Sequence, residues 1–133
     1  MEQKPIRILV VDDEPFICEL LDEYLSMNGY QVSTAGNGED ALVKFKTDRP
    51  HMVLLDINMA GMSGTDVLCK IKEIDDASCV TMLSAFGDDY AIQETSQLGA
   101  DYFIQKPVKL EKLLKFLVSW QASRDKRGSG DSS

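Results

Sequence analysis

Cysteine and histidine are scarce in this sequence, which contains three cysteines, Cys18, Cys69 and Cys79, and one histidine, His51. An odd number of cysteines without a C-x-x-C pair argues against a disulfide framework and against a zinc site. His51 follows a proline at the entry to a strand and has no cysteine or histidine companion, so we expect a structural role for it. Unpaired thiols are typical of a reducing compartment. We therefore expect a cytoplasmic protein.

Basic residues and long apolar runs are also scarce. The 133-residue chain has 14 Lys and Arg against 22 Asp and Glu, a formal charge of -8 at pH 7. This balance argues against a general nucleic-acid surface, which needs a basic patch, and it is compatible with protein partners and divalent cations. No apolar stretch approaches the roughly 20 residues of a membrane span, and the start, MEQKPIR, lacks the apolar core of a signal peptide. We expect neither direct nucleic-acid binding nor membrane insertion.

The sequence does contain a regular alternation of strand and helix patterns. With 44% apolar residues, the chain has the size and composition of one compact domain. Apolar runs of strand length lie at 6–12, 30–35, 51–56, 79–84 and 101–105. Helical periodicity lies at 15–29, 64–73, 88–98 and 109–121, and also after Asn37, which is a suitable capping residue, with Ala41, Leu42 and Phe45 pointing inward.

This alternation predicts an α/β fold, a doubly wound five-stranded parallel sheet with helices on both faces. Right-handed crossovers at this length favour the flavodoxin-like strand order 2-1-3-4-5. The run at 30–35 alternates apolar and polar residues, as an edge strand does, whereas the other runs are nearly continuous in apolar residues. We place the domain at 5–121 and interpret the polar, Gly/Ser-rich segment 122–133 as a flexible tail or a truncated linker.

Polar side chains follow four of the predicted strands at the ends where such sheets bind ligands. The run at 6–12 ends in Asp12 and Asp13, the run at 51–56 in Asp56, the run at 79–84 in Ser84, and the last run leads into Lys106. The first and third strands are neighbours in the predicted order, so the three carboxylates should share a pocket. Hard oxygen ligands of this kind suit Mg²⁺. A carboxylate, a metal, an ammonium and a hydroxyl are together suited to moving a phosphoryl group onto Asp56.

Each of these residues alone also has an ordinary structural explanation. The acids after the first strand could begin a helix, where the helix dipole favours negative charge. Asp56 could be a turn residue, Ser84 a helix cap and Lys106 a solvated charge. It is their joint occurrence at the ends of four strands that favours a functional site.

Three other functions fit parts of this pattern. A Mg²⁺-dependent phosphohydrolase with an Asp nucleophile usually carries a second Asp two residues on, where this chain has Asn58. A flavin-binding electron carrier of the same strand order would need a Ser/Thr/Gly-rich phosphate loop after the first strand, where this chain has DDEP. An interaction module of the same fold that is not phosphorylated is the third alternative.

The sequence resembles the response-regulator receiver domains of two-component and phosphorelay systems, which share the CheY-like fold. The resemblance covers residues 5–121 and rests on ILVVDDE (8–14), LLDINMAGMSG (54–64), TMLSA (81–85) and GADYFIQKP (99–107), in the order and spacing of that family. It implies a cytoplasmic signalling domain that catalyses only its own phosphorylation and dephosphorylation. The implied partner is a sensor histidine kinase or a histidine phosphotransfer protein, whose phosphohistidine supplies the phosphoryl group.

The resemblance also assigns roles to individual residues. Asp56 is then the phosphoacceptor, Ser84 the switch hydroxyl and Lys106 the site lysine, whose bond to Pro107 is often cis in the family. The implied ligands of Mg²⁺ are Asp12, Asp13, Asp56 and the backbone carbonyl of Asn58. The implied switch aromatic is Phe103. A phosphorylation-dependent homodimer is expected through the surface of the helix at 88–98, the strand at 101–105 and the helix at 109–121, where Asp88, Asp89, Tyr90 and Gln93 would face Lys109 and Lys112.

Three positions depart from the family pattern. Ala60 stands where the loop usually has Pro, which should loosen that turn. The switch aromatic is Phe103 and not Tyr, so it has no hydroxyl for a partner, and the side chain of Tyr102 should point to the other face of the strand. Phe86 lies two residues after Ser84, and we expect its ring to hinder the water that hydrolyses the phosphoryl group.

Overall fold

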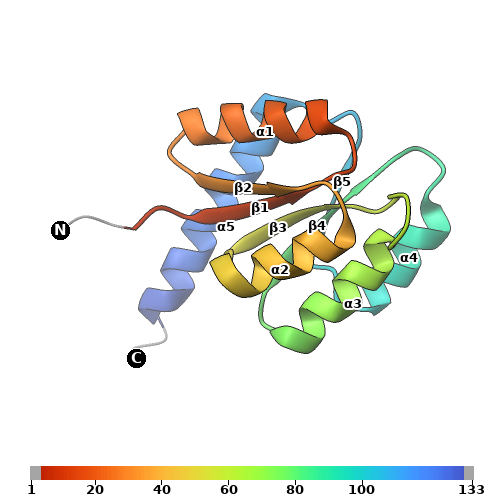
Figure 1. Ribbon diagram of the computed structural model, residues 1–133. Helices are drawn as coiled ribbons and strands as arrows, with labels where there is room; N and C mark the ends of the chain where they lie inside the picture. Colours follow the sequence, from red (N-terminus) through yellow and green to blue (C-terminus); the bar gives the residue numbers. More distant parts are fainter. Residues whose placement is uncertain (1–3, 131–133) are drawn as a thin grey trace.

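The structure is a computed structural model that describes residues 4–130, with side chains described as far as residue 125. Strands and helices alternate along the whole described chain (Figure 1). The strands are β1 (Arg7–Val11), β2 (Gln31–Ala35), β3 (Met52–Asp56), β4 (Cys79–Ser84) and β5 (Tyr102–Gln105). The helices are α1 (Pro15–Met27), α2 (Gly38–Asp48), α3 (Gly64–Ile74), α4 (Asp89–Gln97) and α5 (Leu110–Gly130).

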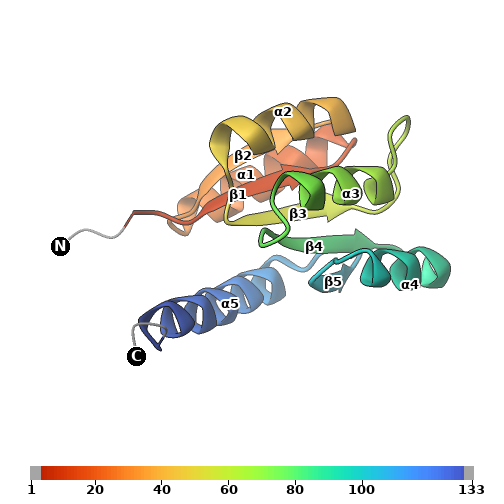
Figure 2. The same ribbon diagram turned by 90° about the horizontal axis from the view of Figure 1, so that it is seen from below.

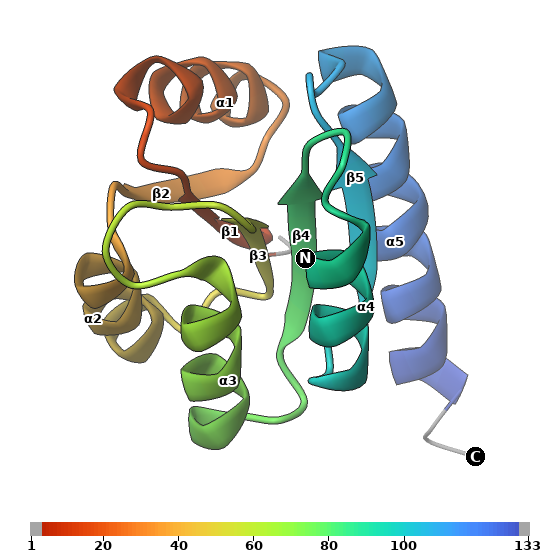
Figure 3. The same cartoon turned by 90° about the vertical axis from the view of Figure 1, so that its right-hand side faces the viewer.

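The five strands form one parallel sheet in the order β2-β1-β3-β4-β5, which confirms the predicted topology. The helices α1 and α5 cover one face of the sheet, and α2, α3 and α4 cover the other (Figures 1 and 3). β2 is an edge strand, as its alternating pattern predicts, and β5 is the opposite edge, beside α4 and α5 (Figure 2). All strands therefore present their carboxyl ends at the same edge of the molecule.

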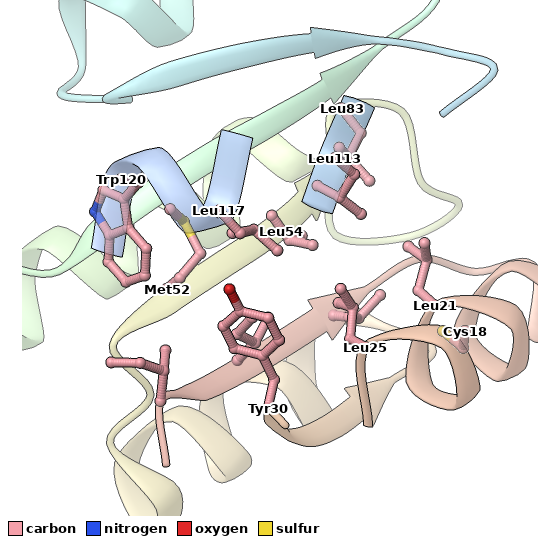
Figure 4. Packing of buried hydrophobic residues seen from close by; sticks show 13 residues of the cluster. Cys18, Leu21, Leu25, Tyr30, Met52, Leu54, Leu83, Leu113, Leu117 and Trp120 are labelled. Atoms are coloured by element: carbon pink, nitrogen blue, oxygen red, sulfur yellow. The ribbon is translucent and has the colours of Figure 1, made fainter. Parts of the chain in front are cut away.

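The continuous apolar runs of the central strands are explained by a hydrophobic core on each face of the sheet. Successive residues of a strand point to opposite faces, so Ile8 and Val10 pack with α1 and α5, whereas Leu9 and Val11 pack with α2 and α3. Figure 4 shows the first core, in which Leu113 and Leu117 of α5 lie beside Leu83 and Leu54, and Leu21 and Leu25 of α1 lie on the side of β1 and β2. Each fully buried aliphatic side chain contributes about 1.5–3 kcal/mol. The strands that carry the polar residues are thus held firmly.

Several predicted helix boundaries agree with local chemistry in the structure. The side chain of Asn37 caps α2 by accepting a hydrogen bond from the backbone N–H of Asp40 at 2.8 Å, which confirms the predicted cap. Pro15 occupies the first turn of α1, where its missing N–H costs nothing. Gly29 follows the end of α1 with φ of +93°, a conformation that glycine adopts without strain.

The last helix is longer than the 109–121 range predicted from the sequence, because α5 continues to Gly130. Residues 121–124 include Gln121, Ala122 and Arg124, which have good helix propensity, and proline is absent from the chain after Pro107. Arg124 also lies over the ring of the buried Trp120, with its guanidinium carbon 6.0 Å from the ring centroid. Of the segment predicted to be a flexible tail, 122–130 is helical, and 131–133 lies outside the described residues.

None of the helices in the described part of the chain has the length and apolar character that a membrane span requires.

Candidate functional site

The three acidic side chains singled out in the sequence lie together at the carboxyl ends of β1 and β3. Asp12 and Asp13 follow β1 directly, and Asp56 is the last residue of β3, the neighbour of β1 in the sheet. Each of the three offers a carboxylate oxygen within 4.8 Å of the others. Figure 3 faces this edge of the sheet, with the loops that surround it in front. Asp12 is fully buried, Asp56 is 4% exposed, and Asp13 is exposed at the mouth.

Backbone N–H groups of the surrounding loops fix each carboxylate. Asp12 Oδ1 accepts a hydrogen bond from the N–H of Glu14 at 2.9 Å, and Asp56 Oδ1 accepts one from the N–H of Asn58 at 3.1 Å. The more exposed Asp13 is held across the mouth, because its Oδ2 accepts a hydrogen bond from the N–H of Ala60 at 3.1 Å. Each carboxylate has oxygen lone pairs left over, so these contacts orient the acids without saturating them.

Lys106 neutralises part of this charge from the opposite side. Its ammonium nitrogen lies 3.1 Å from Asp12 Oδ2 and 3.1 Å from Asp56 Oδ2. The backbone supports this position, since the N–H of Lys106 donates to the carbonyl of Ser84 at 2.6 Å, and the bond from Lys106 to Pro107 is cis. One ammonium therefore contacts the ends of both strands that carry the acids.

The electrostatic setting raises the pKa of Asp56 above its ordinary value. Burial is the main cause, and the nearby charge of Asp12 adds to it, whereas the N–H of Asn58 and the ammonium of Lys106 act in the opposite direction. Burial alone would lower the pKa of Lys106, but its hydrogen bond to Asp12 and the charges of Asp12 and Asp56 outweigh burial, so its pKa is raised. Lys106 is therefore protonated and positively charged at neutral pH.

Ser84 and Phe103 lie on neighbouring strands beside a cavity of about 480 Å³. Ser84 ends β4 and is 3% exposed, and Phe103 of β5 is partly buried against the core on the α2–α4 face. Tyr102 points to the other face of β5, as predicted, and packs edge-on against Phe116 of α5 with ring centroids 5.0 Å apart. The hydroxyl and the aromatic ring thus share one open space next to the acidic cluster.

A comparison of the sequence with protein-family models identifies the family of this chain. The model of the response regulator receiver domain matches residues 8–118. The chain belongs to the response regulator receiver domain family.

Individual relatives of this receiver domain differ in length. Sporulation initiation phosphotransferase F of Bacillus subtilis is 38% identical over 107 residues, which cover 80% of this chain and 86% of the relative. The DNA-binding response regulator MtrA of Mycolicibacterium smegmatis is 37% identical over 108 residues, which cover 81% of this chain but only 47% of that protein. Among solved structures, NtrX from Brucella abortus superposes with a TM-score of 0.87 at 32% identity, covering 98% of this chain and 30% of NtrX.

The acidic cluster of this receiver domain could hold a divalent metal ion. The donors are three carboxylates, and Lys106 is the cation paired with two of them, so the group carries a net negative charge. Hard oxygen donors with excess negative charge are the ligands that Mg²⁺ takes in proteins, usually together with several waters. The residues present therefore fit the metal that the sequence predicts.

Asp88 is a further participant at the mouth of the site. Its carboxylate accepts hydrogen bonds from the side-chain amide of Asn58, at 3.0 Å to each oxygen, and from the N–H of Ala85 at 2.6 Å. No sequence pattern predicts a bond between side chains 30 positions apart in two loops. Phe86, in the same loop, is 93% exposed and does not cover Asp56 in this conformation.

Proposed function

We propose that the domain is the phosphoacceptor of a two-component or phosphorelay system and that Asp56 receives the phosphoryl group. The observation that carries this proposal is the pairing of Lys106 with both Asp12 and Asp56 beside Asp13. A buried acid at a strand end, fixed by a backbone N–H and faced by an ammonium, is positioned for attack on an incoming phosphorus atom.

In this proposal an oxygen of Asp56 attacks the phosphorus of a phosphohistidine on the donor protein. The new P–O bond forms as the P–N bond to the imidazole breaks, and the imidazole nitrogen leaves with the electron pair. Asp12, Asp13, Asp56 and the backbone carbonyl of Asn58 would hold Mg²⁺, which when bound neutralises phosphoryl oxygens. Lys106 supplies the complementary positive charge from the other side. Because transfer relies on positioning and charge, this constellation is sufficient without a general base.

The transferred group would act as a signal through Ser84 and Phe103. It raises the negative charge at Asp56 from about one to about two. It shifts a conformational equilibrium only by interacting differently with the two states. If Ser84 moves toward the phosphoryl group in one state, its hydroxyl and the Lys106 ammonium both bind the phosphoryl group in that state, and this stabilises it over the other. The cavity beside Ser84 then offers room for Phe103 to rotate inward, which changes the surface of α4, β5 and α5.

The partners in this proposal are proteins. The donor is a sensor histidine kinase or a histidine phosphotransfer protein that acts in the cytoplasm. The altered surface would bind an output partner, an attached output domain or a second copy of the domain. Tyr90 on α4 is 80% exposed, and Lys109 and Lys112 line a groove beside β5, so this surface offers both apolar and charged contacts.

The experiment is intact-mass measurement after incubation with acetyl phosphate and Mg²⁺. We expect a gain of one phosphoryl group that is absent without Mg²⁺ and absent in Asp56→Asn. Asp66→Asn, which changes an exposed acid on α3, is the matched control and should gain the group normally. No gain in the native protein contradicts the proposal, and continuous release of inorganic phosphate without a retained adduct supports a phosphohydrolase instead.

A further inference from the structure

Asp88 occupies the N-cap position of α4 but does not cap the helix. An Asp at this position usually accepts a hydrogen bond from a backbone N–H of the first helical turn. Here the Asp88 side chain makes no such bond, and its backbone has φ of -86° and ψ of 23°, unlike the extended conformation of Asn37 and Ser63, which cap α2 and α3. The carboxylate is directed to other donors, so α4 begins without a side-chain cap.

The donors that hold Asp88 belong to the two loops on either side of the site. The amide of Asn58, in the loop after β3, donates to both Asp88 oxygens at 3.0 Å. The N–H of Ala85, directly after Ser84, donates to Oδ2 at 2.6 Å. Asn58 is also bonded to the acceptor, because its backbone N–H donates to Asp56 Oδ1 at 3.1 Å. A continuous chain of hydrogen bonds therefore runs from Asp56 through Asn58 and Asp88 to the residue after Ser84.

We propose that Asp88 is a latch that exchanges partners when Asp56 is phosphorylated. In the latched state it holds the loop of Ser84 to Asn58, and in the released state it caps the N-terminus of α4. This inference rests on the proposed function of Asp56. It makes Asp88 a positioning residue that acts on the Ser84 loop and not on the phosphoryl group.

The charges at the site favour this exchange. A phosphoryl group on Asp56 replaces the single negative charge of the carboxylate by about two, a net gain of about one charge. Asn58, which is bonded to both residues, keeps the Asp88 carboxylate near this added charge. Repulsion between these anions weakens the latched state. The free N–H groups and the helix dipole at the start of α4 provide a favourable alternative partner for the same carboxylate. Release also frees the N–H of Ala85 and lets the Ser84 loop move.

The test compares Asp88→Ser, Asp88→Ala and the native protein. Serine caps helices about as well as aspartate, but its side chain is one bond shorter and bears a single oxygen, so it cannot bridge Asn58 and Ala85. Alanine supports neither state. The probe is beryllofluoride, a mimic of the phosphoryl group, titrated in the presence of Mg²⁺ and followed by backbone amide NMR. Asp66→Ser, which changes an exposed acid in the first turn of α3, is the matched control.

We expect Asp88→Ser to bind beryllofluoride about three- to tenfold more tightly than the native protein, the equivalent of one net hydrogen bond lost from the latched state. Asp88→Ala should lie close to the native protein, because it loses the latch and the cap together. The unbound Asp88→Ser protein should also show the Ala85 amide proton shifted upfield, since its short bond is lost. Asp66→Ser should match the native protein in affinity and in the Ala85 shift.

Two results would overturn the latch while leaving the proposed function intact. One is equal affinity of Asp88→Ser and the native protein, and the other is equally tightened binding by Asp88→Ser and Asp88→Ala, which indicates simple loosening of the loop. Thermal unfolding of each variant verifies that it is folded. If the native protein binds no beryllofluoride and also gains no mass from acetyl phosphate, the proposed function fails and the latch with it.

Discussion

Replacing Lys106 by methionine should destabilise the metal-free protein. Lys106 is the ammonium that lies 3.1 Å from Asp12 and 3.1 Å from Asp56, two carboxylates that are almost completely buried. Methionine keeps a similar length and apolar stem but removes the charge. The two carboxylates then repel one another without a cation between them, and they are too buried for water to solvate them fully.

The magnitude follows from the geometry of the cluster. At an effective dielectric constant near 20, two unit charges at 4 Å interact by about 4 kcal/mol. Removing the ammonium loses attraction of that order to each carboxylate. It also removes the cost of burying the ammonium, and the Lys106 side chain is 23% exposed, so water screens part of the interaction. We expect a net loss of about 2–3 kcal/mol in the free energy of unfolding, near the lower end for breaking a buried ion pair.

The assay is urea unfolding at neutral pH with a chelator present, with Lys109→Met as the control. Lys109 is exposed, three residues along the chain, and should change stability by less than about 0.5 kcal/mol when it becomes Met. Adding Asp56→Asn to Lys106→Met should recover part of the loss, because one of the unpaired charges disappears. If Lys106→Met is as stable as the native protein, the ammonium does not neutralise the cluster and our reading of the site is wrong.

Three further predictions concern other parts of the domain. Gly64→Ala should destabilise the domain by about 3 kcal/mol in urea unfolding, because a Cβ atom there would lie 2.3 Å from the carbonyl oxygen of Asp56. The control Gly36→Ala should be nearly neutral, because a Cβ atom at that position meets no other atom within 4 Å. Burial, with smaller contributions from Arg7 and Arg124, lowers the pKa of His51 in the folded protein. As the pH falls, His51 is therefore protonated in the unfolded chain at a higher pH than in the folded protein, and stability falls as the pH drops below about 6.5. His51→Asn, which retains an acceptor for the N–H of Arg7, should reduce the pH dependence of the free energy of unfolding, measured by urea unfolding between pH 7 and 5. An unchanged pH dependence would exclude His51 as the cause of the loss of stability. Because Phe86 is 93% exposed, its ring can hinder the hydrolytic water only if its loop closes over the phosphorylated Asp56. In that case Phe86→Glu shortens the half-life of the phosphorylated protein, and a half-life equal to that of the native protein would show that the aromatic ring does not hinder water.

The sequence by itself determined the element order, the strand order and the gathering of the acids. Alternating strand and helix patterns leave few topologies once crossovers are right-handed. In a parallel sheet every strand points the same way, so residues that end β1 and β3 must meet at one edge. The proximity of Asp12, Asp13 and Asp56 therefore follows from the chain pattern alone. The opposite orientations of Tyr102 and Phe103 follow from the two-residue period of a strand.

Only the tertiary structure decided how the loops connect these residues. The bond between Asn58 and Asp88 joins two irregular segments whose backbone dihedrals no periodic pattern encodes. The contact of Lys106 with two carboxylates depends on the path of the chain around Pro107. Regular elements repeat one local geometry, so a sequence pattern reveals them. Contacts between loops depend on the positions of both loops after the sheet has formed, and they become visible only in the folded molecule.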